Sequence, residues 1–325
     1  MRSKGWIAVM VSAALAGAGW WTLREAAPPD HFAAADAAEA AASRALERLP
    51  KSAPMPSLPA EPVLPAPVAD LMKNLDAQQA NGPSADFVAK RAALERRAGE
   101  GDAQAEADLG ELLLSCDGYV DFADTDVDTL LVEGIALLGK DAMQLPDSVP
   151  IDAVADAAKR DMARMRDTCA GSQGLALSRN ERLDAYEKLR RGARAGIPAA
   201  MRNFAHFPFE DFADTRSMLA HPERVRERRR EARSYLERAI AAGDVEALAV
   251  AADAHHSGSF VEKSNEMAYA NMVAYQRAHV ADGHSYDADL ALYGDGLTPE
   301  QKSRAQARGE AIFQACCATK PGGAR

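Results

Sequence analysis

Residues 232–279 read ARSYLERAIAAGDVEALAVAADAHHSGSFVEKSNEMAYANMVAYQRAH. Apolar residues recur three and four positions apart on both sides of Gly243, a spacing typical of two amphipathic helices joined by a short turn. Gly243 is expected to end the first helix in a left-handed C-cap, and the small residue Ala247 lets the second helix fold back closely. The stretch therefore predicts a helical hairpin.

The same turn pattern occurs twice more, as ERRAGEGDAQA at 95–105 and LRRGARAGIPAA at 189–200. The turn glycines Gly101, Gly196 and Gly243 lie 95 and 47 residues apart, so one divergent unit fits between the first two. Because a lone hairpin cannot bury its apolar face, such units are expected to stack on one another.

The best unit, 232–279, resembles the Sel1-like repeat family, a branch of the tetratricopeptide-like α-solenoids. The residues that match are Leu236, Ala239, Gly243, Ala247, Gly258, Val261, Ala268 and Ala278. The resemblance covers 180–280 well and 86–115 weakly, and it implies a scaffold for protein–protein interaction. Residues 117–178 fit no unit, so a regular superhelix and a compact, irregular bundle both remain open.

For 84–325 we expect an all-α domain, an irregular stack of helical hairpins. No stretch alternates apolar and polar residues long enough to predict a strand. Ala makes up 70 of the 325 residues, which favours helix because Ala loses the least entropy on becoming helical. Helices are predicted at 85–99, 103–115, 126–142, 151–167, 180–195, 198–205, 221–242, 244–257, 264–280 and 298–317.

The N-terminus predicts the compartment. Arg2 and Lys4 precede an uncharged run from Trp6 to Leu23, which is typical of an export signal within residues 1–25. Cleavage after Ala18 would release a periplasmic or secreted protein. An uncleaved helix of about 27 Å would instead anchor the chain as a single-pass inner-membrane protein with a periplasmic domain. Both readings predict a folded domain outside the cytoplasm.

Residues 26–83 predict a disordered Ala/Pro-rich linker. Nine of the 17 prolines fall between Pro28 and Pro67, and the run at 50–67 favours extended polyproline-II chain. Such a segment acts as a semi-rigid spacer between an anchor and a domain.

The chain has four cysteines, Cys116, Cys169, Cys316 and Cys317. In an exported protein, we expect a disulfide between Cys116 and Cys169, which both lie at or near helix ends. The alternative is a pair of buried free thiols. A bond between the neighbours Cys316 and Cys317 would be strained.

Two further patterns do not fit a metal site. The acidic residues of 121–128 lack the Gly and Glu of a calcium loop, and the histidines at 255, 256, 279 and 284 lack metal-ligand spacing.

The basic run at 222–231 is expected to be a solvated helix face with intrahelical pairs, or alternatively a docking face for an acidic peptide. The four phenylalanines of 204–212 are expected to plug the core, or alternatively to line a ligand groove.

These observations predict an envelope helical-repeat adaptor that binds one or more proteins and touches the membrane through its N-terminal helix if that helix is uncleaved. The net charge of −10 argues against nucleic-acid binding. No catalytic motif, cofactor site or metal site is predicted, and the sequence does not identify the residues that bind a partner. The alternative is an enzyme or ligand-binding protein that acts on cell-wall material, favoured if carboxylates with shifted pKa values converge.

Overall fold

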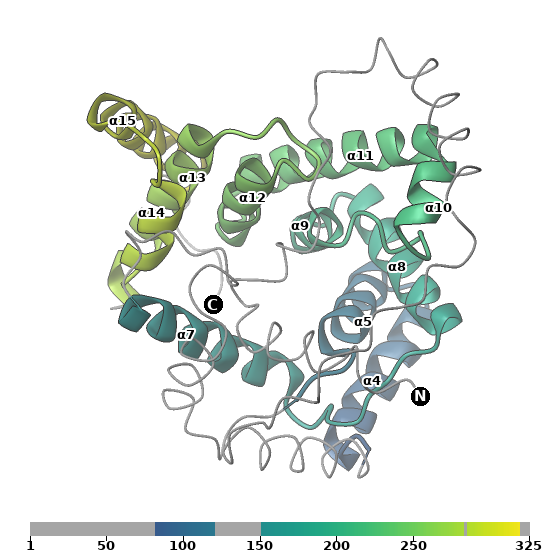
Figure 1. The fold of residues 1–325 in the computed structure, drawn as a ribbon. Coiled ribbons are helices and arrows are strands. Elements are labelled where there is room, and N and C mark those ends of the chain that lie inside the picture. Colours follow the sequence, from purple (N-terminus) through teal and green to yellow (C-terminus); the bar gives the residue numbers. More distant parts are fainter. Residues whose placement is uncertain (1–81, 121–150, 283–284, 319–325) are drawn as a thin grey trace, which may run out of the picture.

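The computed structural model describes residues 82–120, 151–282 and 285–318, and within these ranges all regular secondary structure is helical (Figure 1). The all-α prediction is therefore confirmed for this part of the chain. The predicted signal or anchor helix, nearly all of the linker and the predicted helix at 126–142 lie outside it. The helices are α4 (Ala85–Gly99), α5 (Ala103–Cys116), α7 (Ile151–Cys169), α8 (Arg179–Arg194), α9 (Pro198–His206), α10 (Thr215–Ala220), α11 (Pro222–Ala241), α12 (Glu246–Ser257), α13 (Asn265–Ala278), α14 (Asp287–Tyr293) and α15 (Pro299–Cys316), with a 3₁₀ turn η1 (Val280–Asp282).

Local signals explain where several helices begin. The side chain of Ser84 caps α4 by accepting a hydrogen bond from a backbone N–H of the first turn. In α8 and α15, Ser178 with Glu181 and Thr298 with Gln301 form reciprocal capping boxes. None of the described helices is long and apolar enough to cross a membrane.

The three turn glycines adopt the same conformation. Gly101, Gly196 and Gly243 have φ values of 89°, 86° and 89°. In each turn the glycine N–H donates to the carbonyl three residues earlier, and the next N–H donates to the carbonyl five residues earlier. These two bonds form a Schellman motif, which satisfies carbonyls at the helix end. The chain thus makes the same helix-to-helix turn in three places.

The hairpins pack in sequence. The pairs α4–α5, α8–α9 and α11–α12 each contact within the pair, while α5 packs on α8 and α9 packs on α11. After α12 the order continues through α13, which packs on both α14 and α15. Figure 1 shows that these elements follow an arc from α4 to α14.

Two apolar cores support the arc. One joins α4, α5, α8, α9 and α11, and the other joins α13, α14 and α15. Helix α12 contributes to both, because Ala247 and Ala251 face the first core while Leu248 and Ala252 face the second. Phe204, Phe209 and Phe212 are buried, and the Phe204 ring packs edge-on against Tyr235 with centroids 5.2 Å apart. The expectation of a phenylalanine core plug is confirmed for these three residues.

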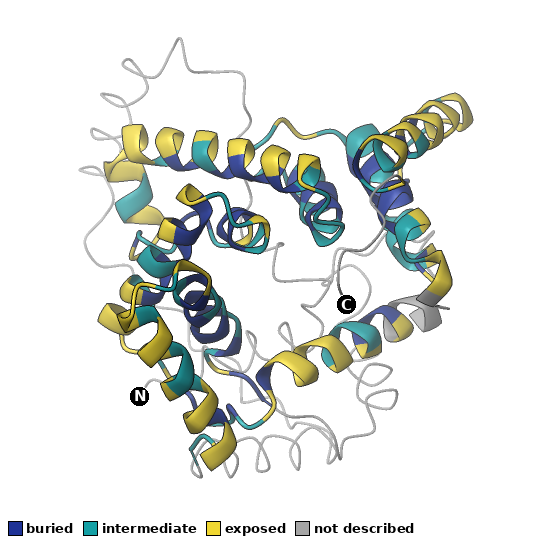
Figure 2. Ribbon diagram, turned by 180° about the vertical axis from the view of Figure 1, so that it is seen from behind, coloured by how far each residue is buried: buried dark blue, intermediate teal, exposed yellow. Residues whose placement is uncertain are grey.

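Helix α7 lies across the two ends of the arc, where it contacts α5 at one end and α14 at the other (Figure 1). Its residues 163–168 are exposed, as the colouring in Figure 2 shows. We refer to helix α7 as the strap, because it connects the first hairpin to the last helices.

A disulfide holds one end of this strap. Cys169, the last residue of α7, is bonded to Cys116, the last residue of α5, with their Cα atoms 5.3 Å apart. Both cysteines are fully buried. The structure also pairs the neighbours Cys316 and Cys317, which the sequence reading did not favour.

Candidate functional site

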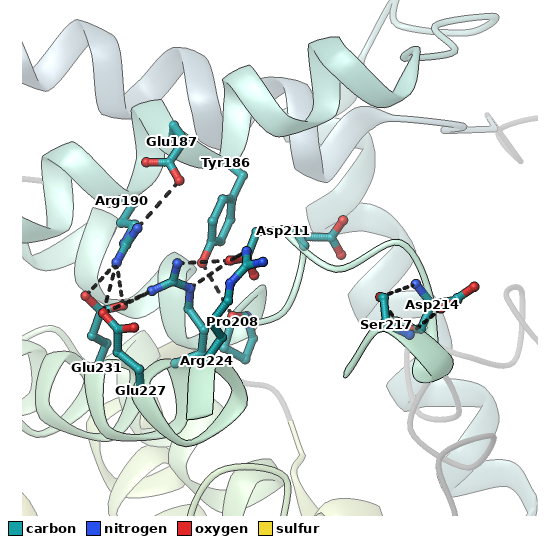
Figure 3. Close-up of polar contacts among 12 residues, drawn as sticks. Tyr186, Glu187, Arg190, Pro208, Asp211, Asp214, Ser217, Arg224, Glu227 and Glu231 are labelled. Atoms are coloured by element: carbon teal, nitrogen blue, oxygen red, sulfur yellow. Dashed lines mark hydrogen bonds and ion pairs between the residues drawn. The ribbon is translucent and has the colours of Figure 1, made fainter. Parts of the chain in front are cut away.

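A network of charged side chains joins α11 to the loop after α9. Arg228 donates from Nε and Nη2 to Oδ2 of Asp211 at 3.0 and 2.9 Å, and from Nη1 to Glu231 at 2.8 Å (Figure 3). The side chains of Arg228 and Asp211 are each only 7% exposed. Arg224 also donates to Asp211, at 3.0 Å, and its guanidinium lies over the ring of Phe212. One buried carboxylate thus holds two arginines of the same helix.

The same network extends to α8. Nη2 of Arg190 donates to both oxygens of Glu231 at 2.9 and 3.1 Å, which joins α8 to α11. Tyr186 donates its hydroxyl to the carbonyl of Pro208 (Figure 3). Burial raises the pKa of Tyr186, so the phenol stays neutral at any physiological pH. Breaking such a buried ion pair leaves an uncompensated charge, so the network fixes the rotation of α11 about its axis.

This inward face of α11 corrects the expectation of a wholly solvated basic run. Arg228 is buried and pairs across elements, whereas the sequence reading expected intrahelical pairs at the surface. The outward face keeps the expected character, since Arg226 pairs with Glu223 at 3.0 Å and Arg233 pairs with Glu237 at 2.9 Å.

A second polar cluster joins the strap α7 to the C-terminal helices. Nη2 of Arg160 donates to Asp289 of α14 at 2.9 Å, and its Nη1 donates to the carbonyl of Ser285 at 2.9 Å. The guanidinium carbon lies 4.6 Å from the centroid of the Tyr286 ring. A single arginine of α7 therefore makes three contacts around the start of α14.

One turn further along α7, Nη2 of Arg164 donates to the hydroxyl of Tyr275 at 2.9 Å. That hydroxyl donates to Oε2 of Glu246 at 3.0 Å, and Nε2 of His279 lies 3.2 Å from Oε1 of the same carboxylate. Burial alone would raise the pKa of Glu246, but its contacts with His279, Arg164 and Tyr275 hold it at about 2. Glu246 is therefore ionised throughout the physiological range.

The other carboxyl groups of this cluster behave in the opposite way. Burial raises the pKa of Asp161 and of Asp289. Asp253, two helical turns after Glu246, accepts a hydrogen bond from the hydroxyl of Tyr293, and burial raises its pKa to about 7. The cluster on α7, α12, α13 and α14 thus brings together carboxyl groups that ionise over a wide pH range.

The histidines are separated by the fold. His255 faces the carbonyl of Glu262, with Nδ1 3.1 Å away, while His256 packs on the ring of Tyr293. His279 belongs to the Glu246 cluster, and His284 lies outside the described residues, as does the acidic stretch at 121–128. Across the described ranges no group of three or more potential ligands is placed to hold a metal ion.

Sequence reasoning missed most of the second cluster. Its members come from four helices, and the carboxylate of Asp289 is 129 residues from its partner Arg160. One local signal was available: Glu246 and Asp253 are seven residues apart and Tyr275 and His279 are four apart, so each pair shares a helix face.

Comparison with known proteins adds no relative. No protein-family model matches the chain, and no curated protein sequence matches it significantly.

Proposed function

We propose that this chain is a helical-repeat adaptor of the cell envelope that binds a protein partner. The observation that supports the proposal most is the repeated helical hairpin. The same two backbone hydrogen bonds form the turns at Gly101, Gly196 and Gly243, and each hairpin packs on the next. Stacked hairpins present a large, rigid surface for their chain length, and proteins use such surfaces to hold other proteins.

The Sel1-like resemblance of 232–279 supports the same class of function. The export signal expected within residues 1–25 and the spacer expected at 26–83 place the domain in the periplasm, held near the inner membrane if the signal is not cleaved. The acidic net charge supports a protein partner over a nucleic acid.

Crosslinking in intact cells tests this function. The full-length chain, carrying a photo-crosslinking residue at exposed positions of several helices in turn, is expected to capture the same protein partner from more than one position. A fusion of alkaline phosphatase to the C-terminus is expected to be active, since that enzyme folds only outside the cytoplasm. Absence of any captured protein, or an inactive fusion, would contradict the proposal.

One observation favours the alternative of a ligand-binding protein or enzyme that acts on cell-wall material. Carboxyl groups with raised pKa values converge at Asp161, Asp253 and Asp289 beside the tyrosines of α13 and α14. Such groups are typical of acid–base sites, although structural ion-pair networks also produce them. Incubation with purified peptidoglycan fragments distinguishes the two: turnover that Asp253→Asn abolishes would favour the enzyme, and no turnover or binding would favour the adaptor.

A further inference from the structure

The outward face of α11 carries a stripe of four arginines, Arg226, Arg229, Arg230 and Arg233, all exposed. Glu223 lies before the stripe and Glu237 after it. Glu227, within the same span, is also exposed, but its carboxylate is directed to the other side of the helix, where it pairs with Arg190 and Arg228. The four arginines lie within eight consecutive residues, and the seven rises from Arg226 to Arg233 cover about 10 Å along the helix axis. We refer to these four residues as the arginine stripe.

The central charges of the arginine stripe are the ones left without partners. Arg226 and Arg233 pair with Glu223 and Glu237, but these pairs lie in water, where such contacts contribute little. Within the described residues, Arg229 and Arg230 make no ion pair. The stripe thus offers two unpaired guanidinium groups in the middle and two weakly held ones beside them.

The opposite face of α11 keeps the arginine stripe in place. Arg228 bonds to Asp211 and Glu231, and Glu231 bonds in turn to Arg190 of α8. Because these pairs are partly or wholly buried, the helix cannot rotate without breaking them. A partner that binds the stripe therefore meets a helix whose orientation is already fixed, although the exposed arginine side chains keep their own rotamer freedom.

Resting on the adaptor function proposed above, we infer that the arginine stripe is the docking surface and that its occupant is an acidic segment of the partner protein. Each guanidinium presents a planar pair of donors that matches a carboxylate, so Asp and Glu side chains fit the stripe individually. The charge pattern also sets the length of the occupant. Its carboxylates must fall over the four arginines and stop short of Glu223 and Glu237, which repel them.

This pattern favours a protein segment over an anionic membrane. A membrane surface is negative over its whole area and would meet Glu223 and Glu237 as well as the arginines. The exposed residues of the stripe include no apolar side chain that would enter a bilayer.

The test compares two double variants of the full-length chain with equal changes in net charge. Arg229→Glu/Arg230→Glu reverses the centre of the stripe, while the control Lys90→Glu/Arg96→Glu reverses two exposed cations of α4 for which the structure gives no ion pair. Since all four side chains are exposed, both variants are expected to keep the wild-type circular dichroism spectrum and melting temperature. A variant that loses its helical signal would contradict the assignment of these residues to the surface.

Binding is measured by fluorescence anisotropy with a synthetic twelve-residue peptide that carries four consecutive Asp and Glu residues at its centre and uncharged residues on both sides, and by sedimentation with vesicles that contain phosphatidylglycerol. Four extended residues span about 13 Å, which is close to the length of the stripe. Wild type and control are expected to bind the peptide, and the stripe variant is expected to bind at least tenfold more weakly. Equal affinity of all three proteins for the peptide would overturn the proposal. Wild-type binding to vesicles but not to the peptide would also overturn it, in favour of a membrane surface.

Photo-crosslinking of the same variants in cells separates this inference from the adaptor function. Capture of the partner by wild type and control, with loss in the stripe variant, supports the stripe. If the stripe variant still captures the partner, the adaptor function is retained and the assignment of the stripe as the docking surface is wrong. If wild type captures no protein, both the adaptor function and the docking surface are wrong.

Discussion

At the scale of single residues, two arginines of α11 show how position decides what a charge does. Arg226 and Arg228 are two residues apart, yet Arg226 is 56% exposed in its side chain and Arg228 is 7% exposed. Arg226 forms part of the exposed face of α11, and Arg228 anchors the opposite face of the same helix to its neighbours. The composition of the run alone does not distinguish them.

Replacing each arginine by alanine is expected to give very different stabilities. Arg228→Ala leaves the carboxylate of Asp211 buried with less compensation, so the free energy of unfolding should fall by about 3 kcal/mol or more. Arg226→Ala removes one exposed pair and should cost less than about 1 kcal/mol. Urea unfolding at neutral pH measures both, and equal losses would contradict the buried network.

Asp253 predicts a dependence of stability on pH. The unfolded chain ionises this carboxyl near its ordinary pKa of 3.8, whereas the folded protein keeps the proton until about pH 7. Between these values the folded state binds more protons than the unfolded state, so this group makes the protein less stable as pH rises. Above about pH 7 the loss is complete and no longer changes with pH.

Asp253→Asn is expected to remove this part of the dependence and to stabilise the protein at pH 7 by about 1 kcal/mol or more, because the amide oxygen can still accept from Tyr293. Urea unfolding from pH 4.5 to 7.5 measures the slope. The matched control is Asp287→Asn, an exposed residue of α14, which should keep the wild-type slope. An unchanged slope in Asp253→Asn would show that the carboxyl ionises normally.

At the scale of helices, contacts between small residues set how closely the elements pack. A Cβ added to Gly110 of α5 would lie 2.6 Å from the carbonyl oxygen of Ala185 in α8. A Cβ on Gly309 of α15 would lie 2.6 Å from the carbonyl oxygen of Ala270 in α13. Both of these helix pairs thus depend on a glycine that brings one helix close to the backbone of an alanine in the other.

Gly110→Ala is expected to push α5 and α8 apart and to lower the free energy of unfolding by about 1–3 kcal/mol. Gly99→Ala is the control, because a Cβ there meets nothing within 4 Å. That substitution should be neutral or slightly stabilising, by up to about 1 kcal/mol, since alanine favours helix over glycine. Thermal unfolding compares the two, and a neutral Gly110→Ala would show that the helices are not in close contact.

The sequence predicted the long helices well because several of them begin or end with local chemistry. Ser178 and Thr298 cap helices with their own side chains, and Gly196 and Gly243 end them. The short helices α10 and α14 were not predicted, since six or seven residues carry too few apolar positions to show a helical period. The buried charges were also missed, because their partners come from distant parts of the chain and leave no local pattern.

At the scale of the whole molecule, the strap α7 joins the first hairpin to the last helices. Its end at Cys169 is bonded to α5, and Arg160 binds α14. Between these two points, Arg164 also contacts Tyr275 and Glu246, although residues 163–168 are exposed. The stability of the molecule therefore depends on two attachments of different chemistry, one covalent and one ionic.

Removing the Cys116–Cys169 disulfide is expected to lower the free energy of unfolding strongly, whereas removing the Cys316–Cys317 disulfide is expected to change it little. Cys116→Ala/Cys169→Ala releases a crosslink across 53 residues, which corresponds to a loss on the order of 4 kcal/mol. Cys316→Ala/Cys317→Ala releases a crosslink between neighbours and should change the free energy of unfolding little. Peptide mapping of the protein purified without reductant is expected to find the 116–169 crosslink, and two alkylated thiols at these positions would contradict it.

The attachment of α7 to α14 has a consequence for how a cell must assemble this protein. A ribosome completes Arg160 well before it adds Asp289, because the two residues lie 129 positions apart. Until α14 has been made, Arg160 lacks the carboxylate of Asp289 and the carbonyl of Ser285, to which it donates in the folded chain. A chain that ends before α14 is therefore expected to leave α7 without its attachment at this side of the arc.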